Sequence, residues 1–132
     1  MSENQKKAKK VLLVDDDHFL LNMYALKFRQ FGYEVDVVGN ATDGLEKLRS
    51  GTKYDAVIFD IIMPMVDGFQ FVETIKRDHL SPDTLLIALT NQSQTEDIER
   101  GKSLGIDGYI VKASTLPSEV VREVMDILEK KL

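Results

Sequence analysis

Two short apolar runs that each end at aspartate constrain this fold more than any other feature. Residues 11–14 run directly into the acids at 15–17, and residues 56–59 run into Asp60. Runs of this length, separated by amphipathic helical segments, favour buried strands in βαβ units with a parallel sheet. Because ligands of such sheets bind at the carboxyl ends of the strands, we expect one shared acidic site there.

The rest of the chain continues the alternation of strands and helices. Further strands are predicted at residues 34–38, 85–89 and 109–111. The first predicted helix places Leu21, Tyr24, Phe28 and Phe31 on one buried face and ends at Gly32. Five strands alternating with five helices predict a single α/β domain, built as a three-layer sandwich with helices on both faces of the sheet.

Polar and turn-forming residues mark where the remaining helices begin and end. Asn40 or Thr42 can cap the second helix, and the third follows Asp67-Gly68. Ser93 or Thr95 opens the fourth, which we expect to be marginal because its apolar residues are few and Gly101 weakens it. Pro117 opens the last helix, whose predicted buried stripe is Val120, Val121, Val124, Ile127 and Leu128.

Composition limits the functional classes. The 132 residues carry a net charge of −5, which disfavours direct binding to nucleic acid or to anionic membranes. We interpret the lysine-rich residues 1–9 as a flexible polar tail and residues 10–132 as the domain. The chain has no cysteine and no run near the roughly 20 apolar residues of a membrane span, so we expect a cytoplasmic protein without a membrane partner.

Polar side chains stand at four predicted strand ends. Asp15 and Asp16 follow the first strand, Asp60 the third, Thr90 the fourth and Lys112 the fifth. Carboxylates gathered at one site repel one another unless a cation neutralises them, and ligand sets made only of oxygen favour a hard ion such as Mg²⁺. Taken singly, the acids could be helix caps, Lys112 a structural ion pair and Thr90 a strand residue.

As a set, and at these spacings, the residues resemble the receiver domains of two-component response regulators, over essentially residues 10–132. The resemblance implies a flavodoxin-like sheet with the strand order 2-1-3-4-5. It also implies a phosphoacceptor role for Asp60, with a histidine kinase, a histidine phosphotransfer protein or a small phosphodonor as the source. Asp16, Asp60 and the main-chain carbonyl of Ile62 match ligands for Mg²⁺ or Mn²⁺, and Asp15 matches an acid that holds the ion through water.

Further roles follow from the same resemblance. Lys112 matches the lysine that pairs with Asp60 or the phosphoryl group, and Thr90 the hydroxyl that bonds a phosphoryl oxygen. Tyr109 matches the switch aromatic that moves with Thr90. This movement remodels a face made by residues 95–104, Tyr109 and residues 118–131, where a downstream protein or a second copy docks. Ile62 and Gln92 match positions that tune the lifetime of the acyl phosphate.

Departures from the family pattern leave an alternative open. Ala113 follows Lys112 where receivers usually carry a cis proline, and Asn91 follows Thr90 where they carry a small residue. A degenerate receiver that acts as a phosphorylation-independent scaffold is therefore the second hypothesis. A phosphohydrolase of the haloacid-dehalogenase type needs a second acid two residues after the nucleophile, but Ile62 stands there, so we do not expect a turnover enzyme.

Overall fold

The computed structural model describes residues 8–130, so residues 1–7 of the expected tail and the end of the expected docking face at Lys131 lie outside the described residues. Strands and helices alternate along the described range. The strands are β1 (Lys10–Val14), β2 (Glu34–Val38), β3 (Ala56–Phe59), β4 (Leu85–Thr90) and β5 (Gly108–Val111). The helices are α1 (His18–Gln30), α2 (Ala41–Arg49), α3 (Gly68–Arg77), α4 (Thr95–Ser103) and α5 (Pro117–Lys130), with a short 3-10 helix, η2 (Lys112–Ser114), before α5.

All strands are parallel and form one sheet in the order β2-β1-β3-β4-β5, which confirms the predicted topology. The register places Val14 opposite both Val38 and Phe59, and Phe59 opposite Ala88. β1 and β3 therefore end level with one another. The residues that follow them, Asp15 and Asp60, meet at the same edge of the sheet.

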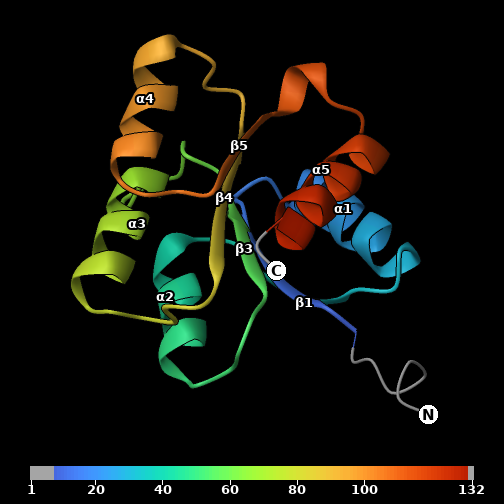
Figure 1. Cartoon of the computed structure of the whole chain (residues 1–132), viewed down its shortest axis with the longest axis horizontal. Coiled ribbons are helices and arrows are strands. Elements are labelled where there is room, and N and C mark those ends of the chain that lie inside the picture. Colours follow the sequence, from blue (N-terminus) through green and yellow to red (C-terminus); the bar gives the residue numbers. More distant parts are fainter. Residues whose placement is uncertain (1–7, 131–132) are drawn as a thin grey trace.

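Two apolar cores lie on opposite faces of the sheet, because successive side chains of a strand alternate between its faces. Helices α1 and α5 cover one face, and α2, α3 and α4 cover the other (Figure 1). Helix α4 is the least anchored, since its one buried residue is Gly101 and Ile98 is half-buried. This agrees with the marginal helix expected from the sequence.

Side chains cap three helix starts, and Asn40 is one of the two caps predicted for α2. Asp17, Asn40 and Asp67 each accept a hydrogen bond from a main-chain N–H in the first turn of their helix. Helix α4 differs: it begins at Thr95, one of the two predicted starts, but its N-cap, Gln94, makes no capping bond through its side chain. Phe31 was predicted on the buried face of α1, and this is wrong. It is the C-cap residue and is 36% exposed, because the chain leaves the helix there.

The junction after Lys112 adopts a trans peptide, since the described residues contain no cis peptide bond. Ala113 lies within η2, and the Thr115 hydroxyl donates to the carbonyl of Val111 at 2.8 Å. This turn carries the chain from the end of β5 into α5. No helix among the described residues has both the length and the apolarity needed to cross a membrane.

Candidate functional site

The carboxylates predicted to share a site do meet at the carboxyl edge of the sheet. Asp15 and Asp60 are buried, with 5% and 8% of their surface exposed, whereas Asp16 is exposed. Each of the three offers an oxygen within 4.8 Å of the others. Burying carboxylates this close together is unfavourable unless a positive group is also present.

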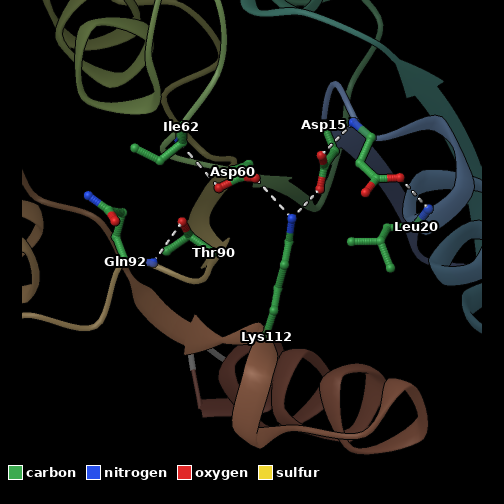
Figure 2. A network of polar contacts seen from close by, with 8 residues as sticks. Asp15, Leu20, Asp60, Ile62, Thr90, Gln92 and Lys112 are labelled. Atoms are coloured by element: carbon green, nitrogen blue, oxygen red, sulfur yellow. Dashed lines mark hydrogen bonds and ion pairs between the residues drawn. The ribbon is translucent and has the colours of Figure 1, made fainter.

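Lys112 supplies that positive group. Its Nζ lies 2.7 Å from Asp15 Oδ2 and 2.9 Å from Asp60 Oδ2, and Figure 2 shows the side chain reaching from the end of β5 to both acids. Burial alone lowers the pKa of the ammonium, but the hydrogen bonds that it donates to Asp15 and Asp60, together with their negative charges, outweigh burial and raise the pKa above its ordinary value. Lys112 is therefore charged at neutral pH.

The backbone fixes the orientation of the same two acids. The N–H of Asp17 donates to Asp15 Oδ1 at 2.9 Å, and the N–H of Ile62 donates to Asp60 Oδ1 at 3.3 Å. Each carboxylate thus uses one oxygen for its own loop and the other for Lys112. Burial raises the pKa of the Asp15 carboxyl, and the bond from Lys112 opposes that rise.

Asp16 differs from its neighbours because it makes no hydrogen bond or ion pair with any residue of the described range 8–130. Its carboxylate is free to bind a ligand from solution. An exposed carboxylate beside two buried ones is a set of hard oxygen donors, which suits Mg²⁺ or Mn²⁺ better than a softer metal. The donor set therefore fits the metal that the sequence predicts.

Thr90 and Tyr109 are connected through the main chain of Gln92. The N–H of Gln92 donates to Thr90 Oγ1 at 3.3 Å, and the Tyr109 hydroxyl donates to the Gln92 carbonyl at 2.5 Å. Thr90 is the last residue of β4 and is fully buried. Burial raises the pKa of Tyr109 to about 12, with a further contribution from Asp97, so its hydroxyl keeps its proton at neutral pH.

This connection was not predicted, because it runs through a main-chain carbonyl and no residue type in the sequence marks it. Thr90, Gln92 and Ile62 flank the Asp60 carboxylate (Figure 2). The geometry thus brings the polar residues predicted at the strand ends to one edge of the sheet. Tyr109 does not contact the acids directly and is linked to Thr90 through Gln92.

A sizeable hollow in the described surface lies away from this site. It measures about 470 Å³ and is lined by Lys9, Lys76 and Asp107, with residues from the starts of β3 and β4. That edge of the sheet is opposite the carboxylates and contains none of them. The pocket that Asp15 and Asp60 do line measures only about 10 Å³, so the acidic site is shallow.

Comparison with known proteins identifies the family. A family model described as the response regulator receiver domain matches residues 11–124. This chain is a response regulator receiver domain. It belongs to a family of signalling modules from two-component systems, and receiver domains interact with histidine kinases and with downstream effectors.

Relatives in sequence and in structure support the assignment. The receiver domain is 35% identical over 124 residues to the transcriptional regulatory protein PrrA of Mycobacterium tuberculosis, across 92% of this chain and 51% of that protein. It is 33% identical over 103 residues to the response regulator ArlR of Staphylococcus saprophyticus, across 78% of this chain and 45% of that protein. The chain thus spans about half the length of these relatives.

Among solved structures, the chemotaxis protein CheY4 of Vibrio cholerae superimposes with a TM-score of 0.84 at 27% identity, covering 92% of this chain and 99% of that one. A CheY-like receiver domain protein from Methanospirillum hungatei gives the same TM-score at 26% identity, covering 94% of this chain and 96% of that one. The fold predicted for this receiver domain is therefore confirmed. PrrA is named a transcriptional regulatory protein, and this chain matches only about half of its length. The expectation that this chain does not bind nucleic acid therefore stays a prediction and is not extended to its longer relatives.

Proposed function

We propose that this receiver domain accepts a phosphoryl group on Asp60 and acts as a phosphorylation switch. The observation that carries the proposal is the shared ammonium: Lys112 Nζ contacts Asp15 and Asp60 at 2.7 and 2.9 Å, at the edge where Asp16 is free. A buried carboxylate whose orientation is fixed by one N–H and one ammonium is better prepared for nucleophilic attack than a freely rotating carboxylate at the surface.

In the proposed reaction an Asp60 oxygen attacks the phosphorus of the donor. A P–O bond forms as the P–N bond of a phosphohistidine breaks, and the electron pair stays with the imidazole nitrogen. With a small donor such as acetyl phosphate, a P–O bond breaks instead. Lys112 lies close enough to Asp60 to transfer its contact to a phosphoryl oxygen, and the Thr90 hydroxyl would bond another.

The metal is part of the proposal. Asp16, Asp60 and the main-chain carbonyl of Ile62 would hold Mg²⁺ or Mn²⁺, with Asp15 contributing through water. When bound, the ion neutralises negative charge on the carboxylates and on the incoming phosphoryl oxygens. Lys112 supplies part of the same neutralisation and keeps Asp15 and Asp60 together.

A protein donor suits the surroundings of Asp60. The site is shallow, and the exposed apolar side chains of Phe19, Ile62 and Leu116 belong to the loops and the helix start that follow β1, β3 and β5. Exposed apolar groups gathered at one edge are typical of protein interfaces. We therefore propose a histidine kinase or a histidine phosphotransfer protein as the physiological donor, acting in the cytoplasm.

The proposed output surface is the face made by α4, β5 and α5. Tyr109 of β5 belongs to this face, and its hydroxyl donates to the Gln92 carbonyl, so a change at Thr90 can reach Tyr109 through two hydrogen bonds. The Tyr109 ring in turn lies beside Gly101 of α4. A downstream protein or a second copy would dock there. Adding beryllofluoride and Mg²⁺ should shift the amide NMR signals of α4 and Tyr109; shifts confined to residues near Asp60 would contradict this surface.

The deciding experiment is incubation with acetyl phosphate and Mg²⁺, followed by intact-mass spectrometry. We expect one added phosphoryl group in the wild type and none in Asp60→Asn, which keeps the side-chain size. The adduct should decay at a different rate in Gln92→Ala, because we propose that Gln92 and Ile62 tune the access of the attacking water to the acyl phosphate. A wild type that gains no mass would favour the alternative, a scaffold that works without phosphorylation.

A further inference from the structure

Met65 combines two unfavourable features at one position. Its backbone φ is 71°, in the left-handed region that side chains rarely adopt, and its side chain is 97% exposed. An apolar side chain that is almost fully in water contributes no packing to offset the backbone strain. Glycine or asparagine would fit this backbone more easily.

The loop that carries Met65 is closed and lies directly after Asp60. The N–H of Gly68 donates to the carbonyl of Ile61 at 2.8 Å, and the N–H of Val66 donates to the carbonyl of Pro64 at 2.8 Å. A Cβ on Gly68 would lie 2.5 Å from the carbonyl oxygen of Asp60, so the two ends of the loop are in contact. Met65 thus lies near the tip of a short loop that follows Asp60 and is closed by these main-chain contacts.

Strained backbone positions such as Met65 cluster at functional sites, where a contact with a binding partner can offset their cost. Asp60 is only 8% exposed, so a protein donor must press its histidine against this edge and cover the loop beside it. A small donor such as acetyl phosphate leaves Met65 in water. Methionine is flexible and polarizable, which suits an apolar contact with another protein surface.

We propose that Met65 is a specificity-determining contact for the phosphohistidine-carrying protein that phosphorylates this receiver domain. The proposal rests on the function proposed above. Ile62, three residues before Met65 in the same loop, is also exposed and apolar, and its N–H donates to Asp60. Removing the Met65 side chain should therefore weaken recognition of the protein donor more than reaction with the small one.

The test compares two donors on the same protein. The probes are acetyl phosphate and a panel of purified sensor histidine kinases from the source organism, each phosphorylated beforehand with labelled ATP. The variants are Met65→Gly, Met65→Asn and the conservative Met65→Leu. The matched control is His79→Gly, because His79 has a φ of 54° and is exposed, but lies in the loop after α3 at the opposite edge of the sheet.

The measured quantity is the rate with the fastest kinase divided by the rate with acetyl phosphate. We expect this ratio to fall at least fivefold in Met65→Gly and Met65→Asn, to recover in Met65→Leu and to stay at the wild-type value in His79→Gly. The Tm of Met65→Gly and Met65→Asn should not fall, because both residues fit a positive φ. A structural role for the side chain would lower it.

An unchanged ratio in Met65→Gly would overturn the proposal, as would a fall in Tm that accounts for the lost rate. If acetyl phosphate phosphorylates the wild type but no kinase in the panel does so, the proposal is also overturned, while the phosphoacceptor function stands. If neither donor reacts, the proposed function itself fails. The two failures are therefore distinguishable.

Discussion

At the scale of single residues, the site is organised by one ammonium group shared between two carboxylates. Asp15 and Asp60 each give Oδ2 to Lys112 and Oδ1 to a main-chain N–H. Removing the ammonium would leave two buried acids facing one another, and breaking a buried pair costs more than losing a surface one. A divalent cation at the same edge can take over that neutralisation.

We therefore predict that Lys112→Ala lowers the free energy of unfolding by about 2 kcal/mol without metal. Mg²⁺ should restore most of the lost stability, because in this variant the ion would bind carboxylates that no longer have a positive partner. Thermal unfolding with and without MgCl₂ measures both effects, with Lys102→Ala, an exposed lysine of α4, as the control. An equal Mg²⁺ shift of Tm in the wild type and in Lys112→Ala would contradict this account.

The acids and Lys112 could be placed from the sequence because parallel strands in register bring their carboxyl ends together, whatever the details of packing. The bond from Tyr109 to the Gln92 carbonyl could not be placed in this way. Every residue has a main-chain carbonyl, so only the fold decides which one a hydroxyl reaches. The same limit applies to the left-handed backbone of Met65.

At the scale of elements, α4 and β5 fit their neighbours through glycines that face isoleucines. A Cβ on Gly101 of α4 would lie 2.5 Å from Ile106 Cδ1, and one on Gly108 of β5 would lie 2.5 Å from Ile127 Cδ1. The sequence indicated only that Gly101 weakens α4. The structure shows that the missing side chain makes room for Ile106 and, at 3.5 Å, for the Tyr109 ring.

A glycine in a helix is normally improved by alanine, by about 1 kcal/mol. For Gly101→Ala we predict the opposite, a loss of about 1–2 kcal/mol, because the new methyl group would overlap Ile106. Combining it with Ile106→Val, which removes the Cδ1 atom, should recover most of the loss. Urea unfolding of the two single variants and the double variant measures this coupling.

Ser103→Ala, at an exposed position of the same helix, is the control for helix propensity. If Gly101→Ala stabilises the protein by the same amount with and without Ile106→Val, the two side chains are not in conflict. The start of α4 follows the same lesson. The helix begins at Thr95, as one of the two predicted starts, but its N-cap, Gln94, makes no side-chain capping bond, which sequence rules based on Ser or Thr do not anticipate.

At the scale of the whole molecule, the sheet separates two apolar cores, and each core includes two tyrosines. Tyr24 and Tyr33 belong to the core under α1 and α5, and Tyr54 and Tyr109 to the other. Burial raises the pKa of all four: Tyr33 and Tyr109 to about 12, Tyr24 above its ordinary value, and Tyr54 further still through its bond to Asp36. The chain has no tryptophan, so absorbance follows these phenols cleanly.

A raised pKa of an acid means that the folded state favours the neutral phenol. The stabilisation is complete below the unfolded pKa of about 10 and is lost as pH rises through the folded values near 12. We predict that absorbance at 295 nm lags behind that of the urea-unfolded chain above pH 10. The absorbance of the folded protein should then rise over the same pH range in which the far-UV circular dichroism is lost, because the buried tyrosines ionise as both cores unfold. Tyrosines that titrate near pH 10 while the circular dichroism stays native would show that the phenols are not held neutral by the fold.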